Sequence, residues 1–170
     1  ALTNQTIRER LSRAYSFPAL ARTGVAIGFN GSIKISGATP TIEDIQRAYA
    51  AGNDPKLIWR TAILRAFRSG RHLETDSDFL TALDDLKARP GSYAAELTSM
   101  DDLATERGEP RLVVFDALDR LSHDWAPIRD LTKGLLLTVL DLQSFRSIRA
   151  KVFMRVDQFA DTELFQFPDS

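Results

Sequence analysis

Arg111-Leu-Val-Val-Phe-Asp-Ala-Leu-Asp-Arg-Leu121 is the stretch of sequence that decides the fold. It begins with an unbroken apolar run, Leu112 to Phe115, in which three of the four residues are β-branched or aromatic. Such a short run predicts a strand that is buried on both faces, as in a parallel sheet. The run ends at Asp116, and open parallel sheets bind their ligands at the carboxyl ends of their strands.

Two interpretations of this ending stand side by side. An aspartate directly after a buried strand has the form of a Walker B element, in which the carboxylate holds the water shell of a nucleotide-bound Mg²⁺. Asp119 and Arg120 follow closely and add a second carboxylate and a guanidinium. The other interpretation is a core strand that is followed by a polar turn, because short motifs also occur by chance.

Several shorter elements are expected before this strand. They are a helix over residues 3–15, a strand over 24–29, a turn at 30–31 and a short strand over 32–36. Thr41 is the expected N-cap of a helix that stops at Gly52. Asp54-Pro55 then begins a second helix, which extends to Gly70 with Trp59 and residues four apart from it on one face.

A helical hairpin is expected between these helices and the central strand. Its first helix is capped by Asp76 or Ser77 and its second ends at Gly108. The acidic residues of the hairpin are assigned to solvated faces; they are Asp84, Asp85, Asp101 and Asp102. The basic residues of the preceding helix, Arg60, Arg65 and Arg68, are likewise assigned to a solvated face rather than to a nucleic-acid surface.

A strand–helix–strand unit is expected after Leu112. A polar turn over residues 122–129 leads to a helix from Asp130 to about residue 146, and the second strand lies within 151–156. If the two strands are parallel neighbours, Asp116 and Arg155 lie on one rim of the sheet. That arrangement suits phosphoryl transfer, in which a carboxylate holds Mg²⁺ and a cation contacts the phosphate. The alternative is a structural ion pair of Arg155 with Asp116 or Asp157.

Composition excludes several classes of protein. The 170 residues contain no cysteine, so disulfides, thiolate zinc sites and a cysteine nucleophile are excluded. They contain only two histidines, which disfavours a histidine-based metal site. A net charge of −1 gives no direct signal for nucleic acid. No membrane-spanning run or signal peptide is visible, so we expect a cytoplasmic protein and no membrane partner. Both chain ends look cut, which predicts a fragment of a longer chain.

Other carboxylate chemistries fit the sequence less well. Phosphatases of the Asp-x-Asp type need two acids two residues apart, whereas Asp116 and Asp119 are three apart. A glycosidase pair is not excluded by spacing, but nothing selects one. The phosphate-binding sequence G-x-x-x-x-G-K-[ST] does not occur in the chain.

The residues from Leu112 to Arg120, LVVFDALDR, resemble the Walker B stretch of bacterial P-loop ATPases of the KAP and STAND groups, which are AAA+-like. Residues 151–159, KVFMRVDQF, with 165–170, FQFPDS, are similar to the sensor strand and following segment of such ATPases. The helix DPKLIWRTAIL, residues 54–64, resembles their insert before the Walker B strand. The resemblance is loose before Asp54 and better from Arg111 onward.

The resemblance implies a role for each polar residue of the rim. Asp116 would be the Mg²⁺ ligand, Asp119 would position the attacking water, and Arg155 would be the sensor. Arg120 would face the nucleotide or a neighbouring subunit. Ala117 stands where many relatives have an acid, which leaves the catalytic base open.

The expected architecture is a three-layer α/β core with a parallel sheet, as in P-loop NTPases. Residues 1–170 would form a single partial domain, with a helical insertion at about 41–107 and a Walker B and sensor unit at about 111–157. The phosphate loop and its central strand would precede Ala1. The intact protein would bind ATP and Mg²⁺ and act as a switch or motor for an attached effector. Its expected partners are the nucleotide and either an effector domain or further copies of the same protein. The competing function is a non-catalytic NTPase-like protein-interaction module.

Overall fold

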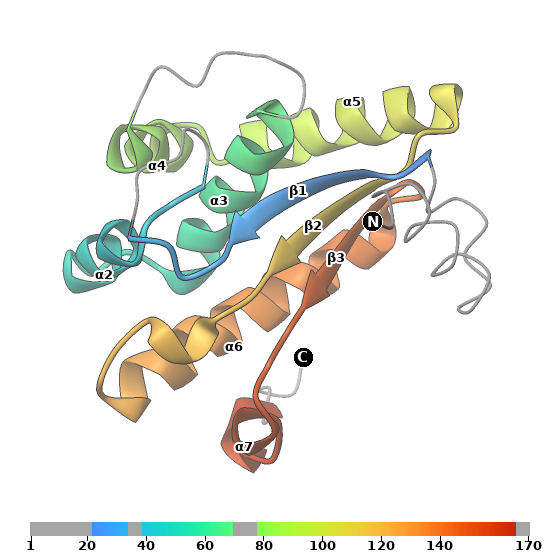
Figure 1. Cartoon of the computed structure of the whole chain (residues 1–170). Coiled ribbons are helices and arrows are strands. Elements are labelled where there is room, and N and C mark those ends of the chain that lie inside the picture. Colours follow the sequence, from blue (N-terminus) through green and yellow to red (C-terminus); the bar gives the residue numbers. More distant parts are fainter. Residues whose placement is uncertain (1–21, 34–38, 70–77, 166–170) are drawn as a thin grey trace.

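Three parallel strands form one sheet in the computed structural model, which describes residues 22–33, 39–69 and 78–165 (Figure 1). The strands are β1 (Gly24–Phe29), β2 (Arg111–Phe115) and β3 (Ile148–Val152), and they lie in the order β1-β2-β3. In the register of the sheet, Val113 of β2 pairs with Ala26 on one side and Ala150 on the other. The fold is therefore mixed α/β, and the expected parallel pairing of the strand before Asp116 with the later strand is confirmed.

Six helices accompany the sheet in the described residues. They are α2 (Ile42–Ala50), α3 (Pro55–Ser69), α4 (Phe79–Ala88), α5 (Ser92–Arg107), α6 (Trp125–Asp141) and α7 (Val156–Phe159). Short 3-10 turns are η2 (Leu118–Arg120), η3 (Leu142–Ser144) and η4 (Thr162–Phe165). None of the helices in this part of the chain has the length and apolarity needed to cross a bilayer.

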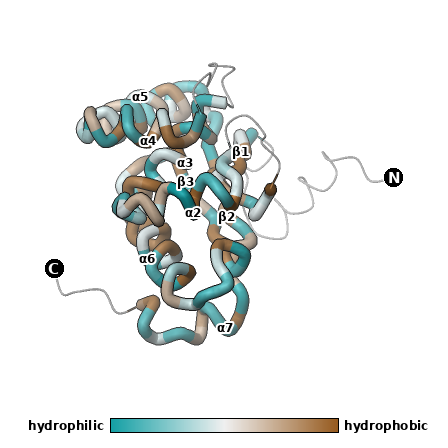
Figure 2. The backbone as a smooth tube through the Cα atoms, turned by 90° about the vertical axis from the view of Figure 1, so that its left-hand side faces the viewer, coloured by the Kyte–Doolittle hydropathy of each residue, from teal (hydrophilic) through white to brown (hydrophobic). Residues whose placement is uncertain are grey.

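Helices α3 and α6 pack together on one face of the sheet, and α2, α4 and α5 pack around α3 (Figures 1 and 2). Successive strands move in one direction across the sheet, so right-handed crossovers place both connections on the same face. The opposite face presents Val25 and Ile27, which are 47% and 39% exposed. The third layer of the expected architecture is not among the described residues.

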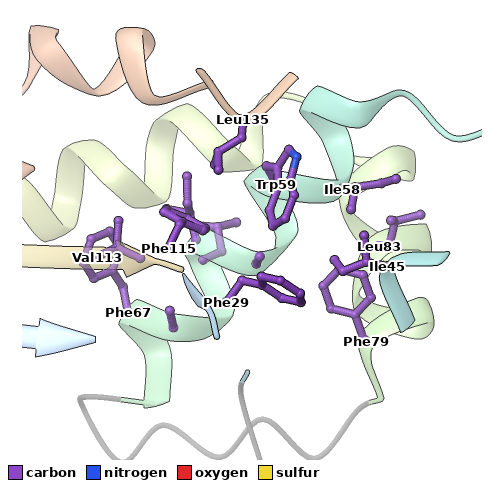
Figure 3. Packing of buried hydrophobic residues seen from close by; sticks show 14 of the residues in the cluster. Phe29, Ile45, Ile58, Trp59, Phe67, Phe79, Leu83, Val113, Phe115 and Leu135 are labelled. Carbon is purple, nitrogen blue, oxygen red and sulfur yellow. The ribbon is translucent and has the colours of Figure 1, made fainter. Parts of the chain in front are cut away.

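The core lies between α3 and the sheet, with Trp59 at its centre (Figure 3). The indole packs edge-on against Phe29 of β1 and Phe115 of β2, with ring centroids 5.8 and 5.7 Å apart. Its Nε1–H donates a hydrogen bond to the carbonyl oxygen of Leu131 on α6 at 2.7 Å. A buried indole with a satisfied N–H joins three elements at once.

Several helix ends follow from local sequence. Thr41 caps α2 and forms a capping box with Asp44, as its position predicted. Asp54 accepts the backbone N–H of Lys56 at the start of α3. Gly52 and Gly108 end α2 and α5 in the left-handed region, with φ of 77° and 58°. The cap of α4 is Asp78, whereas the predicted caps Asp76 and Ser77 lie outside the described residues.

Three predicted boundaries are wrong, and one of them is the end of α6, which lies at Asp141 rather than at about residue 146. Strand β3 ends at Val152, so the strand predicted within residues 151–156 lies too far along the chain. The strand was hard to predict from the sequence because two of its five residues, Arg149 and Lys151, are charged. Both are exposed on one side of the strand, while its other side is covered. Helix α6 begins at Trp125, five residues earlier than expected. Pro127 is tolerated in its first turn, where a backbone N–H has no partner within the helix.

Two charged residues assigned to solvated faces are buried instead. Asp101 is 5% exposed and Arg65 is 4% exposed, whereas Asp84, Asp85 and Asp102 are exposed as expected. Arg65 donates a hydrogen bond to the carbonyl oxygen of Asp78 at 3.3 Å.

The expected helix over residues 3–15 lies outside the described residues, as does most of the expected strand over 32–36, and Ser32 and Ile33 are not part of a strand.

Candidate functional site

Polar residues gather where the three strands end, at the carboxyl edge of the sheet. The loop after β1 contains Gly31, the loop after β2 contains residues 116–121, and the segment after β3 reaches Asp157. The backbone N–H of Asp116 donates to the carbonyl oxygen of Phe29 at 2.9 Å, and the backbone N–H of Phe153 donates to the carbonyl oxygen of Phe115 at 2.8 Å. Ladder hydrogen bonds thus continue to the end of β2 and hold the three loops at one edge.

Asp116 is exposed at the end of β2. Its Oδ1 accepts the backbone N–H of Ala117 at 2.7 Å. Among the described residues it has no ion-pair partner. The carboxylate is therefore accessible from solvent.

The turn after Asp116 has an unusual backbone. Ala117 has φ of 59°, the one positive value at a non-glycine residue in the described part of the chain. This conformation disfavours residues that carry a Cβ atom. Gly31, with φ of 66°, lies against it, and an added Cβ at Gly31 would be 2.8 Å from the Cβ of Ala117. The loops after β1 and β2 are therefore in close contact.

Asp119 and Arg155 meet across the edge of the sheet. Nη1 of Arg155 lies 3.5 Å from Oδ2 of Asp119. The same guanidinium forms two shorter contacts with Asp157, from Nε at 3.1 Å and from Nη2 at 3.0 Å. The sequence predicted that Asp116 and Arg155 would lie on one rim of the sheet, whereas the ion pairs of Arg155 in the described residues are with Asp119 and Asp157. The alternative pairing with Asp157 is present as well.

The electrostatics of this group follow from its hydrogen bonds. The bond to Asp157, and then its charge, raise the pKa of Arg155 above the ordinary value, with smaller effects from Asp119. The hydrogen bond from Arg155 lowers the pKa of Asp157. Both side chains are more than half exposed, so water screens their attraction. These ion pairs therefore contribute little to the stability of the fold, and their main effect is to orient the guanidinium of Arg155.

Arg120 lies on the other side of the turn from Asp119. It is exposed, and an added Cβ at Gly31 would be 3.2 Å from its Cδ and 3.5 Å from its Nη1. Neighbouring residues of one 3-10 turn thus reach in opposite directions, Asp119 toward the segment after β3 and Arg120 toward the loop after β1. The structure does not bring Arg120 together with Arg155.

The donor set fits magnesium only in company with another ligand. No group of three or more histidine, cysteine or acidic residues arranged to hold a metal occurs in the described residues. Asp116 and Asp119 supply carboxylate oxygens, which Mg²⁺ prefers. In proteins Mg²⁺ is commonly bound through one or two carboxylates, several waters and the phosphates of a substrate. A Mg²⁺ ion held by Asp116 would therefore need waters and a phosphate compound to complete its coordination.

Sequence reasoning missed the contribution of Gln158 to the site. This residue of α7 is 1% exposed, and its Oε1 accepts the backbone N–H of Arg155 at 3.3 Å. A side chain three residues into a helix that bonds back to the residue before the helix is one half of a capping box. Arg155 is not a usual N-cap residue and the predicted strand extended to Val156, so the start of a helix here was not predicted.

An apolar groove lies beside the site, next to β3. It has a volume of about 500 Å³ and is lined by Leu136, Val152, Met154, Val156, Phe159 and Phe165. Three of these side chains are strongly exposed: Val156 at 85%, Phe159 at 68% and Phe165 at 41%. Exposed apolar side chains that are grouped in this way are typical of interaction surfaces and ligand-binding grooves.

Comparisons of the chain with protein-family models, with curated proteins and with solved structures found no match.

Proposed function

We propose that this chain is part of a cytoplasmic P-loop NTPase domain of the KAP and STAND kind, which binds and hydrolyses ATP as a switch or motor for an attached effector. The observation that supports it best is the contact of Asp119 with Arg155 at 3.5 Å, between segments that follow two neighbouring parallel strands. Asp116 is exposed at the end of the first of these strands. Two carboxylates and a cation on one sheet edge are the parts that phosphoryl transfer needs.

Each residue has a role in this proposal. Asp116 holds Mg²⁺, whose chemistry when bound is to neutralise charge on the phosphate oxygens. Asp119 orients the attacking water, because its carboxylate lies near the cation that contacts the terminal phosphate. Arg155 binds that phosphate through its Nη1 group. Arg120, which extends toward the loop after β1, faces the nucleotide or a neighbouring subunit.

The phosphate loop must come from outside these 170 residues, since the sequence contains no G-x-x-x-x-G-K-[ST]. We place its strand beside β3, which forms one edge of the described sheet. Ser147 and Phe153 hydrogen-bond to β2, so the backbone groups of Ala150 and Val152 point to the other side. An added strand would pair with these groups and cover part of the apolar groove.

Ala117 favours the second candidate, a non-catalytic interaction module with the same architecture. Relatives in the proposed family have an acid or a glycine at this position. The left-handed backbone of Ala117 suits a glycine, but a methyl side chain supplies no base. On this alternative the full-length protein would bind ATP without turning it over.

Phosphate release by the full-length protein with ATP and Mg²⁺ tests the proposal. Asp116→Asn removes a charge without a change of shape, and we expect turnover to fall by orders of magnitude. The melting temperature should stay nearly constant, because Asp116 is exposed. Asp124→Asn, at another exposed aspartate, is the matched control and should change neither quantity.

A lower melting temperature of Asp116→Asn with unchanged turnover would show that Asp116 is structural. Absence of turnover in the parent, with ATP still bound, would favour the interaction module. Absence of both ATP binding and turnover would refute both candidates.

A further inference from the structure

We propose that Asp157 is the positioning residue that aims Arg155 at the terminal phosphate, and that the contact of Arg155 with Asp119 is exchanged for that phosphate. This inference rests on the proposed function, because it assigns a task to a residue beside the same site. It adds a residue that contacts neither the metal nor the phosphate, and a change that accompanies nucleotide binding.

The two carboxylates hold the guanidinium in different ways. Asp157 uses both oxygens, with Oδ1 3.1 Å from Nε and Oδ2 3.0 Å from Nη2. Two parallel hydrogen bonds fix the plane and direction of a guanidinium. Asp119 uses one oxygen, 3.5 Å from Nη1. The bond to Asp157 is thus the geometric anchor, and the bond to Asp119 is the weaker one.

The anchor is itself held by the backbone. Oδ1 of Asp157 accepts the backbone N–H of Gln158 at 3.0 Å. The side chain of Gln158 in turn accepts the backbone N–H of Arg155. These bonds lie within four consecutive residues, 155 to 158, so the direction of the guanidinium is set locally at the start of α7.

The geometry leaves Nη1 as the group that can change partners. The Nε and Nη2 side of the guanidinium is occupied by Asp157, whereas Nη1 makes a single long contact. A phosphate oxygen bears more charge than a carboxylate oxygen and forms strong bonds to arginine. When ATP is bound, its terminal phosphate replaces Asp119 at Nη1. Asp119 is then released to hold a water molecule at the moment when the phosphate is present.

Nucleotide affinity of the full-length protein distinguishes this role from a structural one. Asp157→Asn should weaken ATP binding about two- to fivefold, the range expected for loss of an exposed charged pair. Affinity for ADP should stay unchanged, because ADP lacks the phosphate that Arg155 contacts. Asp157→Glu keeps the charge and should restore part of the ATP affinity. The control Glu163→Gln removes another exposed carboxylate, which pairs with Arg129, and should change neither affinity.

A second comparison uses Arg155→Ala. In this background Asp157→Asn should have no further effect on ATP affinity, because Asp157 acts only through Arg155. Equal losses of ATP and ADP affinity, an unchanged ATP affinity, or an effect that persists without Arg155 would each overturn the inference. Failure of the parent to bind or hydrolyse ATP would instead overturn the proposed function itself.

Discussion

The carboxylate of Asp101, on helix α5, accepts the backbone N–H of Ser147 at 2.6 Å, just before strand β3 begins. The same side chain accepts the backbone N–H groups of Arg146 at 3.0 Å and Ile148 at 3.2 Å. Ser147 also provides the carbonyl oxygen that accepts the N–H of Arg111, at the start of β2. Asp101 therefore fixes where β3 enters the sheet, and with it the position of the segment that carries Arg155.

Asp101→Asn should destabilise the protein. One of its two oxygens becomes an amide group, which would face a backbone N–H that has lost its acceptor. A buried donor without a partner costs about 1–3 kcal/mol. Asp102→Asn is the matched control, because Asp102 is the exposed neighbour, and it should stay within about 0.5 kcal/mol of the parent. Chemical unfolding monitored by Trp fluorescence measures both, and equal values for the two variants would contradict the assignment.

Gly134→Ala should separate helices α3 and α6. An added Cβ at Gly134 would lie 2.4 Å from the Cβ of Pro55 and 3.0 Å from its backbone carbon, at the start of α3. Overpacking against backbone costs about 1–3 kcal/mol. Gly91→Ala provides the comparison, since an added Cβ there meets nothing within 4 Å. Thermal unfolding should show a loss of stability for the first variant only, and an unchanged melting temperature for Gly134→Ala would disprove the close approach.

Asp78 should make stability depend on pH in acid. Hydrogen bonds from the backbone and side chain of Thr81 lower its pKa below the ordinary value of 3.8. A lowered pKa in the folded state means stabilisation that is complete above 3.8 and is lost as the pH falls through the folded value. Asp78→Asn keeps a capping oxygen but does not titrate. The free energy of unfolding, measured at several pH values below about 5, should fall less steeply with decreasing pH for the variant than for the parent. The same pH dependence in both proteins would contradict the lowered pKa of Asp78.

The 170-residue chain should bind ATP with Mg²⁺ weakly or not at all. Phosphate recognition in P-loop proteins comes mainly from backbone N–H groups and the lysine of the phosphate loop, and this sequence lacks that loop. Isothermal titration calorimetry with the chain and with the full-length protein measures the difference. Micromolar affinity of the chain alone would mean that another phosphate site exists within it.

Local sequence was sufficient for elements whose signals are complete within a few residues. Strand β2 was predicted from four apolar residues in a row, and β1 from a similar run. Thr41 and Gly108 marked helix ends because capping depends on the residue at that position and its immediate neighbours. The parallel arrangement of β2 and β3 was also predicted, but the carboxylate after β2 that Arg155 contacts is Asp119 and not the predicted Asp116.

The tertiary structure alone decided the features that depend on distant partners. Asp101 and Asp102 are adjacent and chemically identical, and only the approach of residues 146–148 makes the first one buried. Strand β3 lies at Ile148–Val152 rather than further along, because pairing with β2 compensates for its exposed charges. The opposite directions of Asp119 and Arg120 follow from contacts with two different loops. Residue order determined the elements of this protein through short-range hydrogen bonds and apolar periodicity. The burial of charged groups and the geometry of the site required contacts between residues that are far apart in the chain.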